Sequence, residues 1–87
     1  MDRDRRFAYP DAMGWAEEID ASGLLCPLPV LKARKRLKGM APGAVLRLVA
    51  TDPAAAIDVP HFCAEAGHEL LSALPEGETQ VYLIRRG

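Results

Sequence analysis

The chain has 87 residues, of which 49% are hydrophobic and 26% charged, and its formal net charge is −1. This length gives one small domain with a limited core, and the near-neutral charge argues against a protein that binds nucleic acid or membranes through its overall charge. No apolar run approaches the ~20 residues of a membrane span and no secretory signal is visible, so we expect a cytoplasmic protein with reduced thiols.

The first part of the chain predicts a tail, a strand and a helix. Residues 1–15 are charged and lack periodicity, as in a tail, and residues 16–87 are expected to form the domain. A short strand is predicted over residues 17–21. A helix is predicted over residues 28–40, where good helix formers carry apolar residues at three- and four-residue spacing. The buried stripe of this helix would consist of Val30, Ala33, Leu37 and Met40.

The middle of the chain predicts a central strand and a second helix. Residues 44–51 are almost entirely apolar, which is typical of a strand that is covered on both faces. The second helix is predicted over residues 52–66, with Asp52 as its N-cap. Pro60 lies inside this segment and is expected to kink or interrupt it, and Asp58 is a candidate cap for a renewed start.

The end of the chain predicts a hairpin, which completes the fold. Strands are expected over residues 69–74 and 79–86, with a turn over residues 75–78. The element order is then β-α-β-α-β-β, and right-handed crossovers place both helices on one face of the sheet. We therefore expect an α/β (α+β) two-layer sandwich with a mixed four-stranded sheet. Its open face carries some apolar side chains and is a candidate surface for a partner or for self-association.

The motif Cys26-Pro27-Leu28-Pro29 lies at the start of the first predicted helix. Proline is tolerated in a first helical turn because its missing N–H would have no partner there. Free N–H groups and the helix dipole favour the thiolate at this position, so we expect a moderately lowered pKa for the Cys26 thiol. The motif has no second thiol, which argues against a thioredoxin-like oxidoreductase. The alternative is a small apolar residue buried at the helix start.

Three ordered blocks of the sequence resemble the TusA/SirA family of small sulfur carriers. The first block contains the cysteine motif. The blocks are DASGLLCPLP at residues 20–29, then TDP at 51–53 with DVPHFC at 58–63 and GHEL at 67–70, and finally YLIRRG at 82–87. The match covers roughly residues 17–87, and the two-layer fold predicted above agrees with the fold of this family.

The resemblance implies that Cys26 carries a persulfide and passes its outer sulfur to an acceptor protein, with Pro27 and Pro29 as the supporting motif. The donor would be a cysteine desulfurase or a rhodanese-like protein, and the acceptor another sulfurtransferase. Implied destinations are tRNA thiolation, molybdenum-cofactor biosynthesis and sulfur oxidation. The chain would act as a sulfurtransferase-like carrier on protein partners, without a cofactor. Two alternatives stay open: an RNA- or protein-binding regulatory module in which Cys26 is structural, and a redox sensor that forms a reversible Cys26–Cys63 bond.

The first predicted helix carries five basic residues and no acidic one among them: Lys32, Arg34, Lys35, Arg36 and Lys38. They form either a solvated face, an RNA-binding surface or a docking surface for acidic partner proteins. No aromatic stacking platform accompanies the charges, so we do not expect direct nucleic-acid binding. We favour docking through Lys32, Lys35 and Arg36, because a partner on this helix would have the sulfur within reach.

Cys63 is the second cysteine and lies in the second predicted helix. We interpret it as a buried packing residue, and a resolving thiol for Cys26 is the alternative. Its side of the helix is shared by Val59, Phe62 and Ala66. His61 and His68 together with Cys63 suggest a metal site, but no C-x-x-C pair completes it. We therefore expect no metal and interpret His68 as a partly buried hydrogen-bonding residue.

Overall fold

Six elements follow one another in the predicted order within residues 15–87, the part of the chain that the computed structural model describes. They are β1 (Glu17–Ala21), α1 (Leu28–Lys38), β2 (Val45–Ala50), α2 (Ala55–Ala66), β3 (Glu69–Glu76) and β4 (Thr79–Arg85). The expected tail, apart from Trp15, lies outside the described residues. None of the helices in residues 15–87 is long and apolar enough to cross a membrane.

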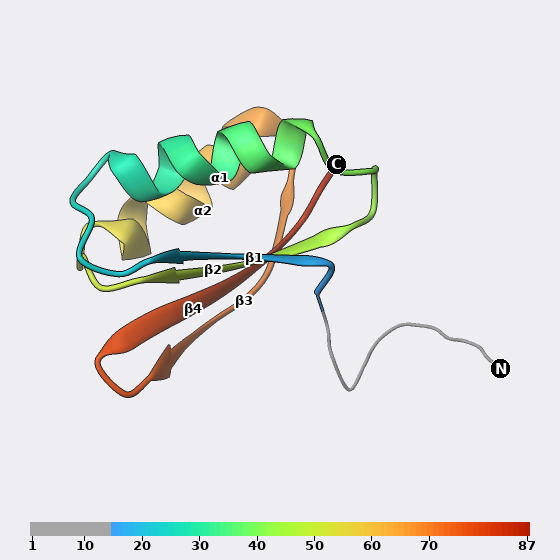
Figure 1. Ribbon diagram of the computed structural model, residues 1–87. Coiled ribbons are helices and arrows are strands. Elements are labelled where there is room, and N and C mark those ends of the chain that lie inside the picture. The colour runs from blue at the N-terminus through green and yellow to red at the C-terminus, as the bar shows by residue number, and fades with distance from the viewer. Residues whose placement is uncertain (1–14) are drawn as a thin grey trace, which may run out of the picture.

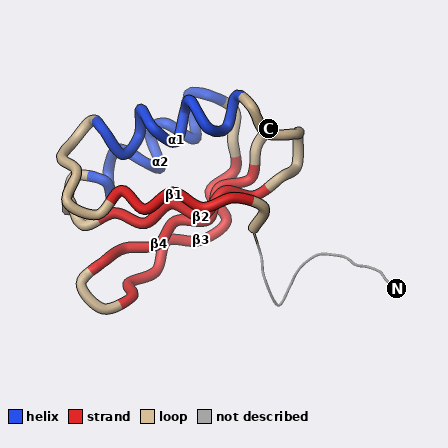
Figure 2. The backbone as a smooth tube through the Cα atoms, in the orientation of Figure 1, coloured by secondary structure: helices blue, strands red, loops and turns tan. Residues whose placement is uncertain are grey.

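The four strands form one mixed sheet in the order β1-β2-β4-β3. β1 pairs with β2 in parallel, and the other two pairs are antiparallel. Both helices lie on the same face of this sheet, as the ribbon and the backbone tube show (Figure 1, Figure 2). The predicted two-layer sandwich is therefore confirmed, and so is the central position of β2.

The core fills the space between the sheet and the two helices. Alternate residues of the central strands face it: Leu46 and Leu48 of β2 are paired in register with Ile84 and Tyr82 of β4, and all four are buried. The helices contribute Ala33, Leu37, Ala55, Val59, Phe62 and Cys63. The predicted stripe of the first helix is confirmed, with Val30 half-buried at its edge.

The second helix differs from its prediction at its start and in its continuity. It begins at Ala55, because Asp52 caps the preceding turn: its Oδ1 accepts the N–H of Ala54 at 3.1 Å. The helix then runs through Pro60 without interruption. A renewed start at Asp58 is therefore wrong, since the N–H of Asp58 already donates to the carbonyl of Ala54 as in a regular helix.

The two chain reversals that follow α2 rest on glycines. Gly67 has a φ of +79°, and beside it the N–H of His68 donates to the carbonyl of Cys63, which confirms the predicted helix end. β3 is longer than predicted and includes Pro75, which an edge strand tolerates. The hairpin turn is therefore reduced to residues 77–78, with Gly77 at φ +63°.

Candidate functional site

Cys26 lies in the loop between β1 and α1 and is exposed to solvent. Pro27 is the residue before the first helical position, and the Cys26–Pro27 peptide bond is cis. Pro29 is buried and attaches the first turn of α1 to the domain. The predicted position of Cys26 at a helix start is therefore confirmed, and its interpretation as a buried apolar residue is wrong.

Two residues from the segment after β2 hold this loop in place. The N–H of Cys26 donates to Oδ2 of Asp52 at 2.6 Å, and the N–H of Gly23 donates to Oγ1 of Thr51 at 2.8 Å. Both bonds join segments that are more than twenty residues apart in the chain. The carboxylate of Asp52 thus connects the cysteine loop to the turn that precedes α2.

The sulfur of Cys26 contacts a carboxylate. Its S–H donates to Oδ2 of Asp58, in the first turn of α2, and the Sγ–Oδ2 distance is 2.6 Å. This hydrogen bond raises the pKa of the Cys26 thiol, and so do desolvation and the negative charges of Asp58 and Asp52. The predicted lowering of the Cys26 pKa is therefore wrong.

The expected influence of the helix dipole fails for a local reason. Pro27 and Pro29 have no N–H to offer, and the N–H of Leu28 between them donates to the carbonyl of Leu25 at 2.8 Å. The motif that places the cysteine at the helix start thus removes the amides that would stabilise a thiolate. The acidic groups next to the sulfur then determine its protonation.

Beside Cys26 the two helices enclose a small hollow of about 190 Å³. Its lining includes Cys26, Pro27, Val30, Arg34, Asp58, His61, Phe62 and Glu65. This volume is smaller than that of typical small-molecule binding sites, which is about 300–1,000 Å³. Large apolar side chains near the cysteine are exposed instead: Leu25 by 69%, Leu28 by 46% and Leu31 by 49%. Such exposure beside an exposed thiol is typical of a protein contact surface.

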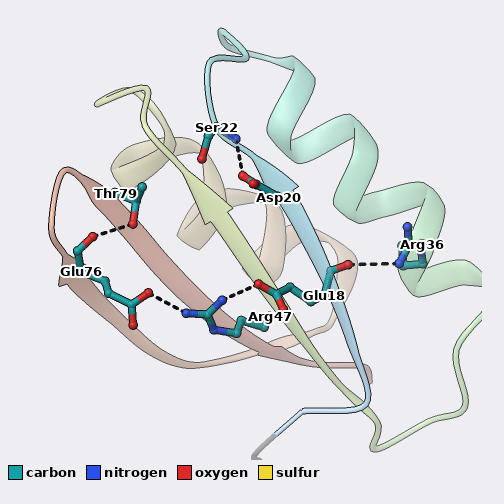
Figure 3. A network of polar contacts seen from close by, with 7 residues as sticks. All are labelled: Glu18, Asp20, Ser22, Arg36, Arg47, Glu76 and Thr79. Carbon is teal, nitrogen blue, oxygen red and sulfur yellow. Dashed lines mark hydrogen bonds and ion pairs between the residues drawn. The ribbon is translucent and has the colours of Figure 1, made fainter.

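The three candidate docking residues share one surface on α1. Lys32, Lys35 and Arg36 are exposed and line an open hollow of about 410 Å³ together with Glu17 of β1. Arg36 is engaged within the domain, because it pairs with the carboxylate of Glu17 at 3.1 Å. Its guanidinium also lies 3.4 Å from the carbonyl oxygen of Glu18 (Figure 3).

The open face of the sheet carries a polar contact network that the sequence did not indicate. Arg47 of β2 forms ion pairs with Glu18 of β1 and Glu76 of β3, and so ties an edge strand on each side to the centre (Figure 3). Its guanidinium also lies 5.0 Å from the centre of the Trp15 ring. Arg47 therefore stabilises the sheet on the side without helices.

Cys63 and the two histidines take separate positions. Cys63 is 2% exposed, and burial raises the pKa of its thiol to about 11, so its interpretation as a packing residue is confirmed. His68 is half-buried and accepts the N–H of Gly87 at Nδ1, as expected. His61 pairs with Glu65 on the surface. Residues 15–87 contain no group of three or more His, Cys, Asp or Glu placed to hold a metal.

Asp58 and Asp52 both form hydrogen bonds with Cys26, and sequence reasoning missed these contacts because both residues were interpreted only as helix caps. The predicted topology already indicated that these residues would lie close to Cys26. In a parallel β1–β2 pair, the segments that follow the two strands leave the sheet at the same edge. The loop with Cys26 and the start of α2 had therefore to be neighbours, and the register of Ala21 opposite Ala50 places them so.

Comparison with known proteins assigns the family. The family described as Sulfurtransferase TusA matches residues 17–86. The sulfur carrier protein TusA of Pseudomonas entomophila is 46% identical over 68 residues, which are 78% of this chain and 85% of the relative. The protein of the same name from Allochromatium vinosum is 44% identical over 70 residues, which are 80% of this chain and 92% of the relative. The crystal structure of the SirA-like protein from Desulfitobacterium hafniense has the same fold, with a TM-score of 0.73 at 23% identity over 83% of this chain and 99% of that one. The chain belongs to the TusA family of sulfurtransferases.

Proposed function

We propose that this protein is a sulfur carrier that holds a persulfide on Cys26 and relays the outer sulfur between protein partners. The relatives named sulfur carrier protein TusA support the carrier role. The assignment to Cys26 rests on the contrast between the two thiols, since Cys26 is exposed and Cys63 is buried in the core. A sulfur that moves from one protein to another has to be accessible to both.

The proposed chemistry is an exchange of sulfane sulfur that needs no external oxidant. The sulfur of Cys26 attacks the outer sulfur of a donor persulfide, the S–S bond of the donor breaks, and the donor sulfur leaves with the proton that Cys26 gives up. In the second transfer an acceptor thiolate attacks the outer sulfur on Cys26. Cys26 is then the leaving group and recovers a proton.

We propose a cysteine desulfurase or rhodanese-like protein as the donor and another sulfurtransferase as the acceptor, both in the cytoplasm. Candidate destinations are tRNA thiolation, molybdenum-cofactor biosynthesis and sulfur oxidation. Docking is proposed at α1, where Lys32 and Lys35 carry no ion pair with other residues of 15–87. Leu28 and Leu31 are exposed on the same helix and add an apolar contact beside Cys26. This combination suits partners with an acidic, partly apolar surface.

Loading with a small persulfide tests the proposal. The wild type, Cys26→Ser and Cys63→Ala are incubated with glutathione persulfide, and mass spectrometry of peptides locates the added sulfur. The wild type and Cys63→Ala are expected to gain one sulfur atom on Cys26, whereas Cys26→Ser gains none and keeps its fold. Sulfur that maps to Cys63 and not to Cys26 would overturn the assignment.

A further inference from the structure

The surroundings of Cys26 are opposite to those of a typical reactive cysteine. Nucleophilic cysteines usually lie next to cations or helix amides, which favour the thiolate. The sulfur of Cys26 instead donates to the carboxylate of Asp58 at 2.6 Å, and Asp52 accepts the N–H of the same residue. The same contact raises the pKa of the thiol. The empty protein therefore holds Cys26 as a neutral thiol at neutral pH.

The causes that shift the pKa of the Cys26 thiol all raise it, so no cation within residues 15–87 offsets the two carboxylates. The hollow beside Cys26 also contains Arg34 of α1, and His61 and Glu65 of α2. The guanidinium of Arg34 lies 5.7 Å from the centre of the Phe62 ring, and His61 pairs with Glu65. Within residues 15–87 the only side chain that forms a hydrogen bond with Sγ is that of Asp58.

We propose that Asp58 weakens the retention of sulfur on Cys26: its carboxylate opposes negative charge on Cys26, so that the loaded protein gives its sulfur away more readily. This inference rests on the proposed function and deepens it. Asp58 would thus determine how tightly the carrier retains its cargo. It would also slow the reaction of the empty thiol with small electrophiles.

The charge on Cys26 differs before and after loading. The terminal S–H of a persulfide is a stronger acid than a thiol, so the loaded form is anionic at neutral pH. A donor persulfide anion and the neutral Cys26 thiol become a neutral donor thiol and an anionic Cys26 persulfide, with the proton moving from Cys26 to the donor sulfur. Loading thus moves one negative charge next to Asp58. Like charges repel, so this carboxylate favours the unloaded side.

Equilibration with a small thiol tests this proposal. The wild type, Asp58→Asn and Glu65→Gln, all with Cys63→Ala, are mixed at neutral pH with glutathione and glutathione persulfide. Intact-mass spectrometry then measures the loaded fraction. Glu65→Gln is the matched control, because it removes a negative charge from the same helix and hollow without touching Sγ. Asp58→Asn is expected to shift the equilibrium toward the loaded protein by about twofold to fivefold, the scale of a solvent-accessible charge pair.

A second readout uses the empty thiol. Asp58→Asn should raise the rate at which iodoacetamide alkylates Cys26 at neutral pH, and Asp58→Glu, which keeps the charge, should behave more like the wild type. Circular dichroism checks the fold, and Asp58→Ser replaces the asparagine variant if that variant does not fold. Equal loading and equal alkylation in Asp58→Asn, Glu65→Gln and the wild type would overturn this proposal alone. A wild type that takes up no sulfur would overturn the proposed function as well.

Discussion

The burial of Cys63 has a consequence that a single-thiol variant can measure. In Cys26→Ser, Cys63 is the remaining thiol of the chain. It is 2% exposed, and its thiol pKa is raised to about 11. At pH 8 a thiol with this pKa is about 0.1% ionised, whereas an ordinary thiol with a pKa of about 8.5 is about one quarter ionised. Ionisation alone therefore slows alkylation by about 200-fold, and burial of the sulfur slows it further.

The assay follows the alkylation of Cys26→Ser by iodoacetamide at pH 8, once in buffer and once in urea that unfolds the chain. The native rate is expected to be at least about 100-fold below the unfolded rate. Cys63→Ala is the matched control, because its exposed Cys26 should react while the domain is folded. If Cys63 reacted at the unfolded rate in a domain that circular dichroism shows to be folded, the packing argument would fail.

Because the pKa of the Cys63 thiol is raised, the stability of the domain should vary with pH in the alkaline range. Below the pKa of the unfolded thiol, about 8.5, both states keep the proton and the contribution of Cys63 to stability is fully present. As the pH rises toward about 11, the unfolded chain ionises first, and the free energy of unfolding falls. Urea midpoints between pH 8 and 11 should therefore decrease more steeply in the wild type than in Cys63→Ala. Parallel decreases in the two proteins would show that Cys63 is not the group responsible.

Two further predictions concern the docking surface and the core. Reversing the charge at Lys32, Lys35 and Arg36 should slow sulfur transfer from a rhodanese-like or desulfurase donor, while the alkylation rate of Cys26 changes little. Added salt should also slow transfer by the wild type. If transfer were independent of salt and the triple variant transferred sulfur at the wild-type rate, these residues would have no docking role. The hydroxyl of Tyr82 is buried without a hydrogen-bond partner in residues 15–87, so Tyr82→Phe should raise the free energy of unfolding by about 1 kcal/mol in a urea titration. A loss of stability in that variant would mean that the hydroxyl has a partner.

The fold was predictable from the sequence because its signals are local. The apolar spacing in α1, the apolar run of β2 and the glycine after α2 each act within a few residues, and all three elements lie where they were expected. The errors in element boundaries have the same local origin. Asp52 was interpreted as the N-cap of the second helix, but in the structure it caps the turn that precedes this helix. Pro60 lies in a helix that tertiary packing on the sheet keeps continuous.

The chemistry of Cys26 was less predictable because it depends on contacts across the fold. Sequence neighbours alone suggested a cysteine next to free amides and a basic helix. The groups that actually contact it, Asp52 and Asp58, are 26 and 32 residues away. A prediction of protonation therefore needed the strand order and not just the motif.

The parallel pairing of β1 and β2 connects these two observations. It brings the start of α1 and the start of α2 to one edge of the sheet, and helix starts attract acidic residues as caps. An acidic side chain that would ordinarily interact with its own helix can then accept a hydrogen bond from the neighbouring loop, as Asp58 does from Cys26. For a carrier this arrangement has a physical advantage over a strongly activated thiolate. A thiolate stabilised by its surroundings would favour the anionic persulfide too and would retain the sulfur, whereas a carboxylate beside the sulfur favours its release.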